Sequence, residues 1–160
     1  MKIYSHISLV FLFAGLALSV AAQNKSSDLA VVVNKGIKLE ELSTADLKRF
    51  FKAEKTKTPD GTKVVLAMFD NGNPERAAAL SGIYAMSETE YADYFVEATF
   101  TGAVNAAPKA LPSMAAVKAF VAQTAGAFSY LKASDVDDSI KVLKIDGKLP
   151  GEADYKLKIK

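Results

Sequence analysis

Short apolar runs alternate with amphipathic segments along the chain. Three runs predict strands, Leu29–Val33, Val64–Phe69 and Ala127–Leu131. The first is continuous and β-branched, which is typical of a strand covered on both faces, as in a parallel sheet. A fourth segment, Ile140–Ile145, alternates apolar residues with lysines as an edge strand does.

Segments with helical spacing lie between these strands and carry clear start signals. Ser43 precedes Asp46 by three positions, and Ser87 precedes Glu90 by the same interval, so both predict capping boxes. Two further caps are predicted, at Asn73, which Pro74 follows, and at Ser113. Helices are therefore predicted to begin after Ser43, Asn73, Ser87 and Ser113. Strands that alternate with helices predict a three-layer α/β domain.

The first 22 residues form a separate segment. A basic start, an uncharged run over Leu9–Leu18 and small residues before Gln23 predict a secretory signal peptide cleaved after Ala22. The alternative is an uncleaved anchor, for which the run is short, because a spanning helix needs about 20 apolar residues. Cleavage leaves 138 of the 160 residues. We expect an exported protein, periplasmic or secreted, with an α/β domain over 23–146 and a polar, loose C-terminal tail over 147–160.

Composition limits the chemistry of the exported chain. The protein has no cysteine, and its single histidine, His6, lies in the leader. The mature chain thus lacks both thiol and imidazole, which excludes cysteine nucleophiles, histidine-based proton transfer and nearly all zinc sites. No motif assembles a nucleophile, a base and an oxyanion donor. We therefore expect a protein that is not an enzyme and that uses neither a cofactor nor a metal.

Charge is almost balanced. Lys2 leaves with the leader, so 20 basic residues become 19 against 18 acidic ones. Broad electrostatic attraction to nucleic acid or to an anionic membrane is therefore not expected. Once the leader is removed, insertion into a membrane is not expected either.

The turn after the second strand is the first of three places suited to holding an anion. It contains Asn71, Gly72 and Asn73, whose backbone N–H groups precede a predicted helix, and anions bind at such helix starts. The alternative is a capped helix without a ligand. The neighbouring carboxylates of Asp70 and Glu75 favour that alternative, because they repel an anion and already satisfy the helix dipole.

The other two places carry hydroxyl groups. One is the turn Thr101-Gly102, and the other is Ser129, within the third predicted strand. Loops often carry binding groups. Plain turn and packing roles are the open alternatives for both places.

Five stretches in the same order resemble the phosphate-type periplasmic substrate-binding proteins and their short, single-lobe relatives. The shared features include a strand ending in V-N, a helix that starts with L-S, a D-G turn before a strand, and a strand with the pattern G-A-x-x-Y. The stretches are Leu29–Gly36, Leu42–Phe51, Pro59–Thr62, Glu90–Phe95 with Phe100–Gly102, and Ala125–Leu131. The resemblance implies one three-layer lobe of the periplasmic binding protein type 2 kind, with a central mixed sheet flanked by helices.

The turn that binds phosphate in that family is altered in this chain. The family places an arginine and G-S-G-T there, whereas this chain has Met68–Pro74, which leaves Gly72 and Asn73 as candidates. Full-size members close two lobes over the ligand, and 138 residues supply one. The resemblance implies a non-catalytic, ABC-transport-type substrate-binding protein that binds phosphate or another small anion weakly. The alternative is an interaction module of the cell envelope that keeps the fold without a ligand and docks on a partner protein or on itself.

Overall fold

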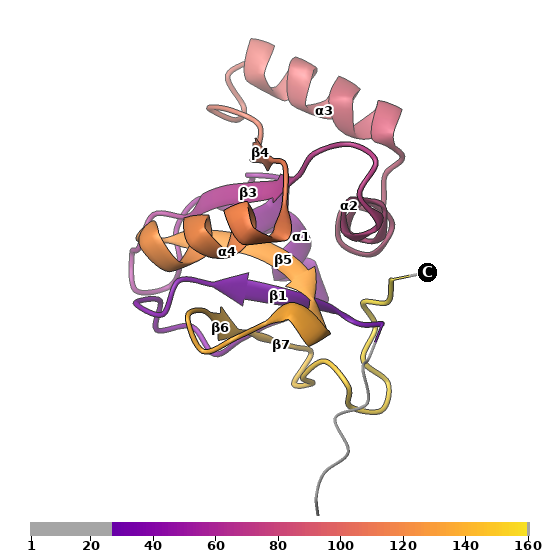
Figure 1. Cartoon of the computed structure of the whole chain (residues 1–160). Coiled ribbons are helices and arrows are strands. Elements are labelled where there is room, and N and C mark those ends of the chain that lie inside the picture. Colours follow the sequence, from indigo (N-terminus) through magenta and orange to yellow (C-terminus); the bar gives the residue numbers. More distant parts are fainter. Residues whose placement is uncertain (1–26, 160) are drawn as a thin grey trace, which may run out of the picture.

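The computed structural model describes residues 27–159, in which strands and helices alternate (Figure 1). The predicted leader over residues 1–22 lies outside the described residues. In chain order the elements are β1 (Leu29–Val33), β2 (Glu41–Leu42), α1 (Thr44–Phe51), β3 (Val65–Phe69), α2 (Pro74–Ala79), the π-helix η1 (Leu80–Tyr84), α3 (Glu88–Phe100), β4 (Lys109–Leu111), α4 (Met114–Gln123), β5 (Ala127–Lys132), the 3₁₀-helix η2 (Ala133–Asp135), β6 (Lys141–Val142) and β7 (Lys144–Ile145).

A central mixed sheet has the strand order β4-β3-β5-β1-β6. β3 runs parallel to both of its neighbours, whereas β1 runs antiparallel to β5 and β6. The mixed sheet implied by the sequence resemblance is confirmed. All five residues of β1 are buried, as its apolar run predicts. Although β1 is covered on both faces, as strands of parallel sheets are, both of its pairings are antiparallel, because burial on both faces fixes how a strand is covered and not its direction.

The segment predicted as one edge strand over 140–145 forms two short strands in different sheets. β6 extends the central sheet, while β7 pairs with β2 in a separate two-stranded parallel sheet. Leu143, between them, is fully buried and donates its N–H to the Val31 carbonyl oxygen at 3.0 Å. The alternating pattern therefore predicts extended backbone correctly, but it does not show that the segment pairs first in the central sheet and then in the two-stranded sheet.

Helices cover both faces of the central sheet. α1 packs on one face, where Phe50 stacks on Phe128 of β5 with ring centroids 5.4 Å apart. Phe51 lies 6.1 Å from Tyr130, the next residue on the same side of β5. α4 crosses the opposite face, in front of the sheet in Figure 1. The three-layer α/β architecture predicted from the sequence is confirmed.

The predicted helix starts form largely as expected. The hydroxyls of Ser43, Ser87 and Ser113 each accept a hydrogen bond from the backbone N–H three residues later. Glu90 completes a capping box by accepting the Ser87 N–H at 2.7 Å. Asp46 does not, and instead accepts a hydrogen bond from Lys55 at 3.3 Å. An aspartate is one methylene shorter than the glutamate that the box requires.

The C-terminal segment is packed, which corrects the loose tail expected from its polar composition. Tyr155 and Leu157 are buried against β1, and the Leu29 N–H donates to the Leu157 carbonyl oxygen at 2.9 Å. Lys158 pairs with the buried Asp28 carboxylate at 2.6 Å. Residues 147–159 therefore form part of the domain.

Replacing Tyr155 by Phe is expected to destabilise the protein by about 1 kcal/mol, the usual net value of one buried hydrogen bond. The Tyr155 hydroxyl donates to the Leu29 carbonyl oxygen at 2.8 Å, so the substitution leaves that oxygen without its partner. Burial also raises the pKa of the Tyr155 hydroxyl well above its usual value, so the group stays neutral throughout the accessible pH range. Urea unfolding of the chain from Gln23 to Lys160 measures the change.

Tyr84→Phe provides the matched control. The Tyr84 hydroxyl is fully buried and has no hydrogen-bond partner among the described residues. Its removal is expected to leave stability unchanged or to raise it, because a buried polar group without a partner carries only its desolvation cost. Equal losses in the two variants would show that the Tyr155 hydrogen bond does not anchor the C-terminal segment.

Candidate functional site

The turn between β3 and α2 carries three of the predicted site residues. Gly72 has a φ of +88°, a conformation that glycine adopts without strain. Asn73 occupies the N-cap position of α2, but its side chain makes no capping hydrogen bond. Its Nδ2 donates to the Asp70 carbonyl oxygen at 2.9 Å instead. Asn71 is exposed at the tip of the turn.

A pocket of about 460 Å³ lies beside this turn. Its walls come from the turn, from α2 and η1, and from the segment that leads into α3. A π-helix such as η1 is rare and often occurs at functional sites. The lining residues are Gly72, Asn73, Pro74, Arg76, Ala77, Leu80, Ser81, Met86, Ser87 and Glu88.

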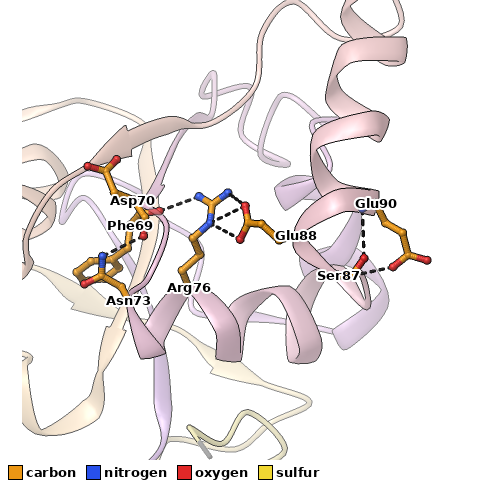
Figure 2. Close-up of polar contacts among 7 residues, drawn as sticks. All are labelled: Phe69, Asp70, Asn73, Arg76, Ser87, Glu88 and Glu90. Carbon is orange, nitrogen blue, oxygen red and sulfur yellow. Dashed lines mark hydrogen bonds and ion pairs between the residues drawn. The ribbon is translucent and has the colours of Figure 1, made fainter.

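Arg76 is the cation among the lining residues of this pocket, and only 7% of its side chain is exposed. Its Nη1 donates to the carbonyl oxygen of Phe69, the last residue of β3, at 2.8 Å. Its Nε donates to the Glu88 carboxylate at 2.8 Å, and its Nη2 donates to the same carboxylate (Figure 2). The guanidinium thus bridges the end of β3 and the first turn of α3.

The surroundings of Arg76 strengthen its charge interactions. The Tyr91 ring lies 5.0 Å from the guanidinium carbon and shields it from water. Hydrogen bonding to Glu88 raises the pKa of Arg76, and the same contact lowers the pKa of Glu88. Burial raises the pKa of Tyr91 to about 12, so its hydroxyl is neutral. The site therefore holds one permanent cation and one carboxylate, with 45% of the carboxylate side chain exposed to solvent.

The remaining predicted residues lie elsewhere. Thr101 ends α3, where its hydroxyl donates to the Glu97 carbonyl oxygen at 2.9 Å, and Gly102 follows with a φ of +73°. A helix of this length places them roughly 20 Å from the pocket end of α3. Ser129 is fully buried, and its hydroxyl donates to the Ala67 carbonyl oxygen at 2.9 Å.

The predicted site residues therefore do not converge on one cleft. Gly72 and Asn73 alone among them line the pocket. A binding site built jointly from the β3–α2 turn, Thr101 and Ser129 is incompatible with this geometry. Thr101 and Gly102 form a turn at the end of α3 and Ser129 packs within the sheet, which are the turn and packing roles stated as alternatives.

Sequence reasoning missed Arg76. The residue stands at helical spacing from Ala79, Leu80 and Ile83, all of which are buried. A charged residue on an otherwise apolar stripe of a helix is a signal of a buried charge that requires a partner. The family pattern has its arginine at the turn itself, whereas Arg76 lies just after the turn, on α2.

Comparisons with known proteins agree with this fold. No model of a known protein family matches the sequence. An ABC-type phosphate transport receptor from Vibrio cholerae superposes with a TM-score of 0.63 at 18% identity, covering 77% of this chain. PstS from Borrelia burgdorferi superposes with a TM-score of 0.64 at 11% identity, covering 83% of this chain. This chain shares the fold of part of these two solved structures.

The chain spans about half the length of these structures, namely 48% of the Vibrio receptor and 55% of the Borrelia protein. A putative phosphate ABC transporter substrate-binding protein from Clostridium perfringens, with bound phosphate, matches at a TM-score of 0.61 and 18% identity. There the alignment covers 75% of this chain and 45% of the other. The resemblance stated from the sequence is thus confirmed at the level of fold.

Proposed function

We propose that this protein is an exported, non-catalytic substrate-binding protein that holds a small anion in the pocket beside Arg76. The buried guanidinium carries the proposal, because a buried cation that faces a pocket is the strongest recognition element for an anion among the described side chains. Export rests on the leader predicted from residues 1–22. Within the described residues, no helix has the length and apolar character needed to cross a bilayer.

The position of Arg76 in the fold supports this function. Ligands of open α/β sheets bind beyond the carboxyl ends of the strands, and Arg76 is tied to the carbonyl oxygen at the end of β3. Gly72 and Asn73 line the same pocket. The similar solved structures are described as phosphate receptors and phosphate-binding proteins, which agrees with an anionic ligand.

Two features predict weak binding. Glu88 already holds the guanidinium, so a ligand competes with an intramolecular carboxylate. Gly72 and Ser87, which line the pocket, are exposed, so part of a bound ligand remains in water. Both features reduce the free energy gained when an anion is transferred from solvent to the site.

Calorimetry tests this proposal. The chain from Gln23 to Lys160 is titrated with phosphate, sulfate and small carboxylates at millimolar concentration. We expect a binding heat for at least one of these anions, with a dissociation constant in the millimolar range. A flat trace across the whole set would contradict the binding function and leave the fold as the sole similarity.

A second candidate function, protein interaction, is favoured by the outer surface of α3. Phe100 is 92% exposed and Val96 is 72% exposed, and large apolar side chains are rarely so open. α3 stands off from the sheet in Figure 1, with its C-terminal end directed away from the rest of the domain. The helix carries four acidic residues and no basic one.

If α3 mediates self-association, the protein is expected to form a dimer whose population rises with concentration, and Phe100→Ser is expected to abolish it. Static light scattering between about 10 μM and 1 mM distinguishes the two states. Met114→Ser, at an apolar position 39% exposed on α4, serves as the matched control and should dimerise like the parent chain. A monomer at every concentration would rule out self-association.

A further inference from the structure

The contact between Glu88 and Arg76 indicates which group a ligand would replace. The Phe69 carbonyl oxygen and the Glu88 carboxylate hold the Arg76 guanidinium from two sides, and both charged residues line the pocket (Figure 2). The Glu88 side chain is 45% exposed and that of Arg76 is 7% exposed. The carboxylate can therefore turn into solvent and be hydrated, while the guanidinium must stay in place.

The way in which Arg76 is held favours a planar anion. Its Nε and Nη2 both bind the Glu88 carboxylate, the two-point contact that matches a carboxylate in shape and charge. Two more carboxylates, those of Asp70 and Glu75, flank the lining residues Gly72–Pro74 in the chain. Their negative charge disfavours a doubly charged anion such as phosphate more than a singly charged one.

The rest of the pocket is largely apolar. Pro74, Ala77, Leu80 and Met86 line it together with the hydroxyls of Ser81 and Ser87. A volume of about 460 Å³ lies within the range of small-molecule sites and far exceeds what a lone inorganic anion occupies. An anionic ligand with an aliphatic body would fill this space and displace water from the apolar wall.

Building on the proposed function, we propose that the ligand is a small monocarboxylate with an aliphatic chain, and that its carboxylate replaces that of Glu88 on the Arg76 guanidinium. The chain of the ligand then packs against Ala77, Leu80 and Met86. In the free protein, the Glu88 carboxylate occupies the position on the Arg76 guanidinium that the ligand carboxylate would take. No covalent step is involved, since one carboxylate exchanges for another.

Calorimetry with acetate, butyrate, hexanoate and inorganic phosphate on the chain from Gln23 to Lys160 tests the inference. Each added methylene is expected to tighten binding about two- to fourfold, from the usual gain per buried methylene in a partly open pocket. Glu88→Gln is expected to tighten binding of every carboxylate at least tenfold, because it removes the internal competitor. Glu97→Gln, on the same helix and outside the pocket lining, is the matched control and should bind like the parent chain.

A second variant tests the apolar wall without touching the ion pair. Ala77 is exposed and lines the pocket, so Ala77→Phe is expected to fill it and to abolish the dependence on chain length. Ala115→Phe, at an exposed position on α4, controls for the added ring. Equal affinities for acetate and hexanoate in the parent chain would overturn the inference.

The failure of this inference is distinguishable from failure of the proposed function. If phosphate binds more tightly than hexanoate, and Glu88→Gln does not bind carboxylates more tightly than the parent chain, the carboxylate assignment is overturned. The proposed anion-binding function would still stand. An absence of heat with all four anions, in the parent chain and in Glu88→Gln alike, would overturn both. Thermal unfolding of each variant confirms that the comparison is made between folded proteins.

Discussion

Gly126→Ala is expected to reduce the free energy of unfolding by at least about 3 kcal/mol, the largest effect predicted for any single substitution here. Gly126 has a φ of +78°, which a Cβ atom strains. A Cβ at this position would lie 2.0 Å from the Lys63 carbonyl oxygen, a backbone atom that cannot rotate away. The Gly126 carbonyl oxygen accepts a hydrogen bond from the Val65 N–H at 2.9 Å, so the clash falls where β3 and β5 begin to pair.

Gly61→Ala isolates the contribution of the clash. Gly61 has a φ of +86°, yet nothing lies within 4 Å of the Cβ that alanine would add. The cost at this position is therefore expected to be about 1 kcal/mol, from backbone strain alone. Denaturant unfolding of both variants measures the difference, and losses of similar size would show that Gly126 is retained for its backbone conformation and not for the close approach of the strands.

Arg76→Gln is expected to weaken binding of any anion in the pocket by at least about 30-fold, the lower end of what removal of one partner from a hydrogen-bonded charge pair costs. The variant loses the charge and the two-point contact together. It also removes the donor to the Phe69 carbonyl oxygen, which is expected to cost about 1 to 3 kcal/mol of stability. Glu88 remains hydrated at the surface, so the protein is expected to stay folded.

Arg49→Gln is the control for this substitution. Arg49 lies on α1 with 58% of its side chain exposed, and its ion pair with Asp46 is 3.8 Å long. Exposed pairs of this kind contribute little to stability, so changes below about 0.5 kcal/mol are expected, with unchanged anion binding. If Arg76→Gln and Arg49→Gln retained the same affinity, the pocket beside Arg76 could not be the binding site.

Local signals in the sequence predicted β1, β3, β5 and the starts of the four α-helices, but not the short strands β2 and β4. Ser87 and Glu90 form their capping box because the interaction spans a single helical turn and needs no tertiary partner. The pattern over Leu29–Val33 gave burial but not strand direction, because the partners of β1 lie about 100 residues away in the sequence. Tyr155 shows the same limit, since a polar stretch with few apolar residues gives no indication that they pack on β1.

The candidate site was predictable only in part, for a related reason. Gly72 and Asn73 follow a strand and precede a helix, so their place at a strand end could be inferred from the local order. The partnership of Arg76 with Glu88 joins two helices that meet only in the folded protein. Ser129 illustrates the converse error, because a small hydroxyl residue in a strand serves a neighbouring strand as readily as a ligand.

The most direct measurement of the central claim is an NMR titration that follows the Nε–H resonance of Arg76 while phosphate or hexanoate is added to the chain from Gln23 to Lys160. Burial and hydrogen bonding slow the exchange of this proton with water, which makes it observable. We predict a saturable shift of that resonance together with the backbone N–H of Gly72 and Asn73. An unchanged Arg76 resonance, with shifts confined to exposed lysines or absent altogether, would contradict an anion site at this pocket.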